Sequence, residues 1–254
     1  MSVDIDLSSK VAIITGAGSG IGRETAILFG KAGADVVATD IDLPTAQETA
    51  ALVEKTGARA MPAQIDVQDV AAANAAVAAT IERFARVDIL VNNAAAWTIK
   101  PFHELEWSDY VRDVHVSLLG AMAMTRAVYD VMRQQRSGNV VNLISDGGRI
   151  GEANLVAYGA AKAGVIGFTK GFAREAGRYG IRCNAVSPGT TRTPASTEMI
   201  DKWGGEESIL KGYPIRRLGE PIDQANAILF FASECSSWVT GQILSVSGGF
   251  TMVD

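Results

Sequence analysis

The chain has 254 residues, which is long enough for one large domain with a well-filled core. Hydrophobic residues make up 48% and charged residues 20%, a balance that excludes a disordered chain and indicates a soluble globular protein. The net charge of −5 argues against a nucleic-acid-binding surface, and the longest apolar runs are far too short to span a membrane.

Short apolar runs alternate with segments of helical periodicity along the whole chain. Strands are predicted over residues 10–15, 34–40, 59–66, 88–92, 139–144, 182–186 and 242–246. Helices are predicted from the glycine-rich stretch 16–22 to about residue 33, over 43–56, 70–85, 107–135 and 221–233, and around Tyr158. Such alternation builds right-handed βαβ units, so we expect an α/β fold with a doubly wound parallel sheet. No linker or internal repeat interrupts it, and residues 1–254 are interpreted as a single domain.

Three glycines follow the first predicted strand, with the spacing Gly16-x-x-x-Gly20-x-Gly22. Glycine lets the backbone turn tightly and approach a pyrophosphate at the N-terminus of the next helix. Asp40 ends the second predicted strand, where a carboxylate can accept both ribose hydroxyls of NAD and would repel the extra phosphate of NADP. The pattern therefore predicts a dinucleotide site that prefers NAD. The alternative for Asp40 is a turn or helix-capping role, which suits Asp42 better.

Tyr158 and Lys162 are four residues apart in a predicted helix, which places both side chains on one face. An ammonium about 4 Å from a phenol favours the phenolate by roughly 4 kcal/mol at an effective dielectric constant of about 20. Because one pKa unit is about 1.4 kcal/mol, we expect the pKa of Tyr158 to fall by roughly three units, to near neutrality. Such a phenol is suited to general acid–base catalysis. The alternative is a half-buried tyrosine followed by a solvated lysine.

The two cysteines and two histidines do not form a metal site or a redox pair by spacing. Cys183 and Cys235 are interpreted as buried structural thiols, which suits a reducing cytoplasm. His103 and His115 are expected at the surface or at an interface. No metal is predicted.

Several motifs stand together in one order: Thr15-Gly16-x-x-x-Gly20-Ile21-Gly22, Asn92-Asn93-Ala94, Ser145, Tyr158-x-x-x-Lys162 and Pro188-Gly189. In this order the chain resembles the short-chain dehydrogenases/reductases, a Rossmann-type family, from Lys10 to Gly249. Within the family it looks most like the branch acting on 2-hydroxycyclohexanecarboxyl-CoA and related hydroxyacyl-CoA thioesters or cyclic alcohols.

This resemblance implies an NAD-dependent oxidoreductase that interconverts a secondary alcohol and a ketone by hydride transfer. It implies that Tyr158 is the catalytic acid/base and that Lys162 binds the nicotinamide ribose and lowers the pKa of Tyr158. Ser145 would orient the substrate oxygen. The cofactor-binding residues that it implies are Gly16, Ser19, Gly20, Ile21, Gly22, Asp40, Ile41, Asp66, Val67, Asn93, Ala94, Tyr158, Lys162, Pro188, Gly189, Thr191 and Thr193.

Two positions depart from the family pattern. Ser117 stands where the family often has an asparagine whose main-chain carbonyl holds a water of the proton relay, and Ala95 replaces a usual glycine. We expect the Ser117 hydroxyl to bond back to its own helix, so that the carbonyl supports the relay. The departures also keep open a second class of function, a catalytically impaired dinucleotide-binding partner subunit.

The substrate pocket is expected to include Trp97, Phe102, Asp146, Arg149 and Leu155, covered by a lid at about residues 190–215 that contains Trp203 and two glycines. The substrate stays open between a cyclic or aromatic secondary alcohol and a hydroxyacyl-CoA thioester. Candidate cations for a CoA phosphate, each equally interpretable as a solvated charge, are Arg149, Arg192, Lys202, Lys211, Arg216 and Arg217.

The helix around residues 122–131 and the helix after Tyr158 carry more apolar residues than one core-facing stripe needs. The resemblance implies that these two helices pair with their symmetry mates in a homodimer or homotetramer.

Overall fold

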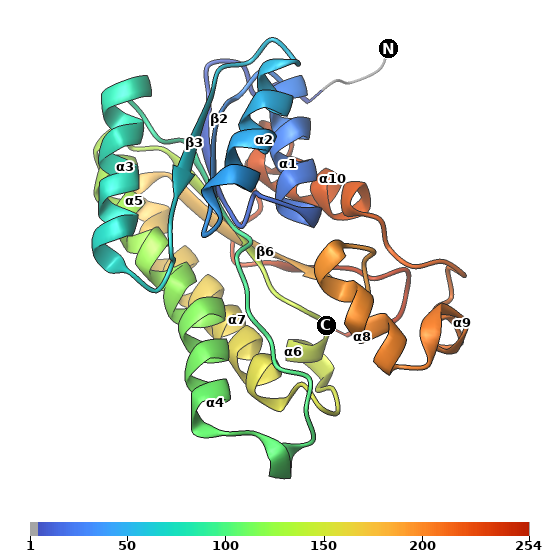
Figure 1. Cartoon of the computed structure of the whole chain (residues 1–254). Helices are drawn as coiled ribbons and strands as arrows, with labels where there is room; N and C mark the ends of the chain where they lie inside the picture. Colours follow the sequence, from blue (N-terminus) through green and yellow to red (C-terminus); the bar gives the residue numbers. More distant parts are fainter. Residues whose placement is uncertain (1–4, 254) are drawn as a thin grey trace.

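Seven parallel strands form one sheet in the computed structural model, which describes residues 5–253 (Figure 1). Their spatial order is β3-β2-β1-β4-β5-β6-β7. The strands are β1 (Val11–Thr15), β2 (Asp35–Asp40), β3 (Ala60–Gln64), β4 (Ile89–Asn92), β5 (Gly138–Leu143), β6 (Ile181–Pro188) and β7 (Ile243–Val246). The chain starts at β1, builds outward to β3, and then returns to place β4 on the other side of β1. Ligands of such sheets bind at this reversal point, outside the carboxyl ends of the strands.

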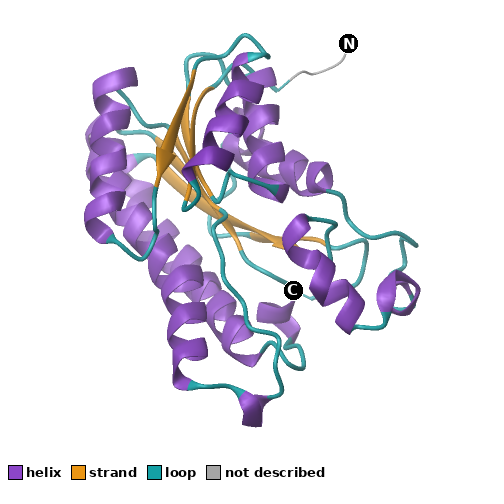
Figure 2. Ribbon diagram, in the orientation of Figure 1, coloured by secondary structure: helices purple, strands orange, loops and turns teal. Residues whose placement is uncertain are grey.

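Helices cover both faces of the sheet (Figure 2). One face carries α1 (Gly20–Lys31), α2 (Leu43–Glu54) and α10 (Pro221–Ala232), and the other carries α3 (Val70–Phe84), α5 (Gly120–Gln135) and α7 (Val156–Ala176). Because both faces are covered, every residue of β1 and β5 is buried. The predicted doubly wound α/β fold is confirmed.

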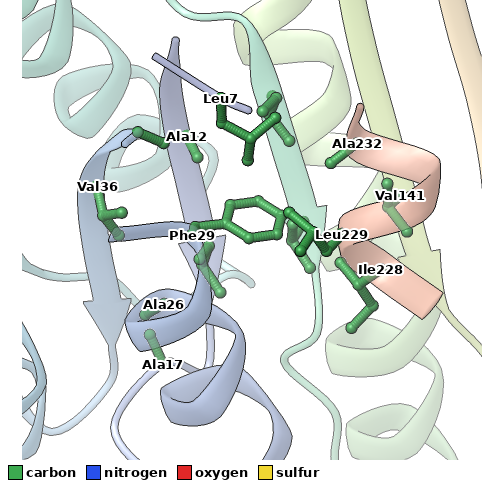
Figure 3. Packing of buried hydrophobic residues seen from close by; sticks show 14 of the residues in the cluster. Leu7, Ala12, Ala17, Ala26, Phe29, Val36, Val141, Ile228, Leu229 and Ala232 are labelled. Atoms are coloured by element: carbon green, nitrogen blue, oxygen red, sulfur yellow. The ribbon is translucent and has the colours of Figure 1, made fainter. Parts of the chain in front are cut away.

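The hydrophobic core has two parts, one on each side of the sheet. Figure 3 shows the part beneath α1 and α10, where the ring of Phe29 lies against Leu229 and Ile228. On the opposite side, Met124 and Val128 of α5 are completely buried. These layers fix the strands from both sides.

The structure adds short helices that the sequence pattern did not indicate. The lid segment, for which no helix was predicted, contains a 3₁₀ turn (Pro194–Ser196) and the helices α8 (Thr197–Lys202) and α9 (Gly205–Leu210). Helices of six residues are too short to show a clear apolar period. The remaining short elements are α6 (Gly147–Ile150) and 3₁₀ turns at Phe102–Glu104, Gly177–Tyr179 and Glu234–Ser236.

The helix predicted over residues 107–135 is divided. It consists of α4 (Trp107–Val114), a π-helical turn (His115–Leu119) and α5. A π-turn inserts one extra residue into the helical repeat and often lies at a functional site.

The predictions for the histidines and for one cysteine are confirmed, and the prediction for the other cysteine was wrong. His103 and His115 are exposed, and Cys183 is buried in β6. Cys235 is exposed, because it lies in the 3₁₀ turn after α10 and not in a strand or on a core-facing helix. No helix within residues 5–253 combines the length and the apolarity that a bilayer crossing needs.

Candidate active site

A cavity of about 530 Å³ opens at the carboxyl ends of the strands. It collects most of the residues that the sequence singled out. Those that line it are Gly16, Ser19, Gly20, Ile21, Asp40, Ile41, Asp66, Val67, Asn93, Ala94, Trp97, Ser145, Asp146, Leu155, Tyr158, Lys162, Pro188, Gly189, Thr191 and Thr193. Segments far apart in the chain meet here, since each follows the end of a different parallel strand.

Glycine is needed at three positions in the glycine loop, the segment that joins β1 to the start of α1. Gly16 and Gly20 have φ angles of +63° and +53°, which side-chain-bearing residues rarely adopt. Gly22 does not line the cavity, but a Cβ on it would lie 2.2 Å from the Gly16 carbonyl oxygen. A Cβ on Gly20 would lie 2.9 Å from the Thr193 side chain across the cavity. The loop therefore leaves bare backbone at the N-terminus of α1, which fits a pyrophosphate.

Asp40 lies at the end of β2 and combines the two roles that the sequence left open. Its carboxylate accepts hydrogen bonds from the Gly18 N–H at 2.8 Å and from the Asp42 N–H at 3.1 Å. Asp42 precedes α2 but makes no capping hydrogen bond through its side chain. Asp40 and its neighbour Ile41 both line the cavity. A negative charge thus stands at the position where a ribose would be held.

The loop after β4 is fastened to the glycine loop. The Asn93 side-chain amide donates to the main-chain carbonyls of Thr15 and Gly16, each at 2.9 Å. The Thr15 hydroxyl accepts from the N–H groups of Asn93 and Ala94, at 3.0 and 3.1 Å. Because β1 and β4 are neighbours in the sheet, these bonds join the loop after β1 to the loop after β4, and both loops line the cavity.

Ser145, Tyr158 and Lys162 meet at the centre of the cavity. Ser145 follows β5, and its hydroxyl bonds the Tyr158 hydroxyl. Lys162 lies one turn after Tyr158 on α7, is completely buried, and donates to the Leu143 carbonyl at 2.7 Å. Its ammonium is 5.6 Å from the centroid of the Tyr158 ring. Gly148 lets the segment after Ser145 lie close to α7, since a Cβ on Gly148 would lie only 2.8 Å from the Cβ of Lys162.

The pKa values of this group differ from the expectation. Burial raises the pKa of Tyr158 above its ordinary value, which outweighs the lowering by the Ser145 hydrogen bond; the charges of Glu152 and Asp113 raise it further. Burial also lowers the pKa of Lys162 to about 7. The predicted fall in the Tyr158 pKa was therefore wrong for the chain by itself. The prediction counted the charge of Lys162 but not the loss of water around both groups.

Ser117 lies in the π-helical turn and is buried, but it does not line the cavity. Its hydroxyl donates to the Ala96 carbonyl at 3.0 Å and accepts from the Ala96 N–H at 3.2 Å. The expectation that it would bond back to its own helix was wrong, because the Ala96 backbone offers a donor and an acceptor together. One turn earlier, Asp113 accepts from the Thr98 N–H at 2.9 Å, so the α4–α5 helix holds the loop over residues 96–98.

Two of the expected substrate residues do not reach the cavity. Arg149 donates instead to the Ser245 hydroxyl at 2.5 Å and to the Val253 carbonyl at 2.7 Å, which fastens the C-terminal segment. Phe102 is exposed and packs on Tyr110. Both predictions were wrong, since closeness in sequence to a motif does not decide on which side of a short helix a side chain lies.

The other expected substrate residues form one wall. The Trp97 ring meets the Tyr158 ring edge to face, at 5.9 Å between centroids. Leu155 is buried beside them. Asp146 is buried as well, and it accepts from the hydroxyls of Ser187 and Ser245 at 2.6 and 3.2 Å.

Several residues of the cavity escaped the sequence reasoning. Among them are Arg112, Glu152 and Phe250, while Met199 and Tyr213 lie within the predicted lid but were not singled out. Tyr213 and Phe250 stack at 4.9 Å between centroids, and the Tyr213 hydroxyl accepts from the Thr190 N–H at 2.7 Å. Glu152 had one usable signal, its position between the two motif residues Ser145 and Tyr158. The aromatic pair had none, because it joins the lid to the C-terminal segment.

Comparison with protein families matches residues 16–251 to the family described as Enoyl-(Acyl carrier protein) reductase. The chain belongs to the short-chain dehydrogenase/reductase family. Such proteins are oxidoreductases that work with a nicotinamide dinucleotide, so the Ser145–Tyr158–Lys162 group is the candidate catalytic centre.

Individual relatives within the short-chain dehydrogenase/reductase family match along nearly the whole chain. The (2S)-[(R)-hydroxy(phenyl)methyl]succinyl-CoA dehydrogenase subunit BbsD of Thauera aromatica is 39% identical over 243 residues, 96% of this chain and 97% of its own. The 7alpha-hydroxysteroid dehydrogenase of Escherichia coli K12 is 36% identical, over 98% of this chain and 96% of its own. A solved 7alpha-hydroxysteroid dehydrogenase, complexed with NADH and 7-oxo glycochenodeoxycholic acid, has a TM-score of 0.93 and 35% identity, covering 98% of this chain and 97% of that one.

The two ends of the lid of this short-chain dehydrogenase/reductase lie close together, because Thr191 pairs with Gly219 in a parallel β-bridge. Met199 and Trp203 of the lid line the cavity. Gly204 and Gly205 separate α8 from α9 with φ angles of +84° and +80°.

None of the six cations considered for a CoA phosphate lines the cavity. Arg192 pairs with Glu206 and Glu220, and Lys202 pairs with Glu198 at 2.8 Å. Arg217 pairs with Asp223, while Arg216 donates to the Leu210 carbonyl. Lys211 is exposed. Four of the six cations therefore have partners in the lid or at the start of α10.

Proposed function

We propose that this protein is an NAD-dependent dehydrogenase that interconverts a cyclic or aromatic secondary alcohol and its ketone, with Tyr158 as the acid/base. The observation that carries the proposal is the meeting of Ser145, Tyr158 and Lys162 between a glycine loop on one side and the aromatic wall of Trp97 on the other. The relative named for a hydroxysteroid supports a cyclic alcohol.

The residues present fit a nicotinamide dinucleotide. Gly16, Gly20 and the N-terminus of α1 would receive the pyrophosphate, and Asp40 would accept hydrogen bonds from the adenosine ribose. The carboxylate of Asp40 would repel the additional phosphate of NADP, so we propose NAD. When bound, the nicotinamide ring accepts or supplies the hydride.

The protein's own part is to position the substrate and move one proton. During oxidation the Ser145 and Tyr158 oxygens hold the alcohol oxygen. Tyr158 must first lose its own proton, and its phenolate then takes the hydroxyl proton as the carbon–hydrogen bond gives up its hydride. In reduction Tyr158 returns that proton to the ketone oxygen. Lys162 stands beside Tyr158 with a pKa of about 7, so it can gain or lose a proton near neutral pH.

A hydroxyacyl-CoA thioester is the second candidate substrate. It is favoured by the relative from Thauera aromatica, whose name is that of a CoA-thioester dehydrogenase subunit. The position of all six candidate cations outside the cavity argues against a CoA phosphate held inside it.

A catalytically impaired partner subunit is the alternative from another class. The complete Ser145–Tyr158–Lys162 group argues against it, because a dinucleotide-binding scaffold has no need of the paired Ser145 and Tyr158 hydroxyls in the cavity. We also propose that the protein forms a homodimer or homotetramer through α5 and α7, where Met122 and Val156 are 40% and 44% exposed and Leu119, in the π-turn before α5, is 44% exposed.

The deciding experiment follows formation of the reduced nicotinamide by its near-ultraviolet absorbance. The purified protein would be given cyclic and aromatic secondary alcohols and hydroxyacyl-CoA thioesters, each with NAD and with NADP. Oxidation of the free alcohols with NAD supports the proposal. Oxidation of the thioesters alone would favour the second candidate, and NAD binding without any turnover would favour the partner subunit.

A further inference from the structure

Two carboxylates, Glu152 and Asp146, line the part of the cavity around Ser145 and Tyr158, which we call the substrate half. The Glu152 side chain folds over Gly147, with its Oε2 3.1 Å from where a Cβ on Gly147 would lie. Within residues 5–253 that carboxylate has neither a hydrogen-bond donor nor an ion-pair partner. Asp146 is 2% exposed, and its Oδ2 accepts no hydrogen bond from any described residue.

The cations of the same half do not neutralise these acids. Arg112 donates to the Trp97 carbonyl and the Thr98 hydroxyl and pairs with Asp113 at 3.4 Å. Lys162 donates to the Leu143 carbonyl. The substrate half of the cavity therefore offers carboxylate oxygens with unused capacity to accept hydrogen bonds.

A half-buried carboxylate without a donor is costly, and a ligand that supplies a donor removes that cost. The structure shows the cost, since burial and the charge of Asp146 raise the pKa of Glu152 to about 7. Glu152 is also close enough to Tyr158 for its charge to raise the pKa of that phenol. A group held by Glu152 would thus lie near the alcohol carbon on which Tyr158 acts.

We propose that Glu152 is a specificity-determining residue that accepts a hydrogen bond from a second donor group of the substrate, a hydroxyl or an ammonium. The inference rests on the proposed function and narrows its substrate class. Cyclic alcohols with such a donor near the reacting carbon are favoured, and alcohols with a carboxylate at the same place are repelled.

Four alcohols test the assignment: cyclohexanol, a cyclohexanediol, an aminocyclohexanol and a hydroxycyclohexanecarboxylate. In Glu152→Leu, kcat/KM for the diol should fall by about 10- to 100-fold relative to cyclohexanol, the effect of one hydrogen bond to a charged group. Glu152→Gln should restore most of the diol preference, because its carbonyl still accepts, but it should lose the preference for the ammonium. Glu54→Gln, an exposed acid on α2, is the matched control and should change no ratio.

A pH series gives a readout that a purely structural role would not move. The kcat/KM ratio of hydroxycyclohexanecarboxylate to cyclohexanol should fall by about tenfold as pH rises through 7 and Glu152 becomes charged, and the fall should be clearly smaller in Glu152→Gln. The other titratable groups facing this part of the cavity are Arg112, Asp146, Tyr158, Lys162 and Tyr213. Lys162 loses its charge in the same pH range, which also disfavours a carboxylate relative to a neutral alcohol, so only the part of the fall that Glu152→Gln removes is assigned to Glu152.

The failures of the two proposals are distinguishable. Equal losses for cyclohexanol and the diol in Glu152→Leu would overturn the assignment of Glu152 and leave the proposed function standing. A parent enzyme that oxidises cyclohexanol but prefers the carboxylate at high pH would overturn it as well. If none of the four alcohols is oxidised with NAD, the proposed function fails and the inference fails with it.

Discussion

Ser117 and Ala96 form a reciprocal pair, in which one hydroxyl donates to the Ala96 carbonyl at 3.0 Å and accepts from the Ala96 N–H at 3.2 Å. The pair joins the π-helical turn before α5 to the loop that carries Trp97 into the cavity. The side chain at this position therefore holds a loop of the active site, in addition to any part that its main chain plays.

Ser117→Ala should weaken the folded state, because the N–H and carbonyl of Ala96 lose their partner. We expect a loss of about 1–3 kcal/mol in the free energy of unfolding, measured by denaturant titration. KM should rise more than kcat falls, since the loop positions the substrate. Ser208→Ala, at an exposed serine of α9, is the control. An unchanged stability would show that water replaces the hydroxyl at no cost.

Tyr158→Phe removes the proton donor and keeps the ring that packs against Trp97. We expect kcat to fall by at least ~10²-fold, the usual share of general acid–base catalysis, with NAD affinity nearly unchanged. Steady-state rates and NAD titration check both parts. Tyr110→Phe, on α4 and outside the cavity, should retain the parent rate. If the Tyr158→Phe variant keeps most of the parent activity, the assignment of Tyr158 is wrong.

Asp40→Asn removes the charge but keeps an oxygen for the N–H groups of Gly18 and Asp42. The ratio of kcat/KM with NAD to that with NADP should fall by about 10- to 100-fold, because the repulsion of the added phosphate is lost. Asp42→Asn, whose side chain makes no capping bond, should leave the ratio nearly unchanged. A parent enzyme that already prefers NADP would contradict this prediction.

Lys162 should make stability depend on pH. Its pKa falls from 10.5 to about 7 on folding, so between these values the unfolded chain binds one proton more than the folded chain. Stability must then rise with pH in this window, by up to ~1.4 kcal/mol per pH unit. In Lys162→Met this contribution should vanish, with the largest gain over the parent at pH 7 and below. Parallel slopes for both proteins in urea titrations from neutral to alkaline pH would refute it.

The exposed apolar residues Leu119, Met122 and Val156 should be covered in an assembly. Light scattering at micromolar concentration should show a dimer or tetramer. Met122→Glu should weaken the assembly by placing an unpaired charge in the interface. Met252 of the C-terminal segment is 79% exposed, so Met252→Glu is the control and should leave the assembly unchanged. A monomeric parent protein would contradict the proposed interface.

The sequence determined the fold class and the identity of the catalytic group. Both depend on local spacing: the alternation of strand and helix periods sets the sheet, and Tyr158 and Lys162 share a face because they are four residues apart on α7. The division of the helix over residues 107–135 by the π-turn at His115–Leu119 was not predicted.

Only the tertiary structure decided the environment of each group. Burial reversed the expected direction of the Tyr158 pKa. Arg149 turned to the C-terminal segment, while Glu152, three residues later, turned into the cavity. The stack of Tyr213 on Phe250 joins segments that are distant in the chain. Desolvation and side-chain partners are properties of the packed molecule, because water is excluded by residues that sequence spacing does not relate to one another.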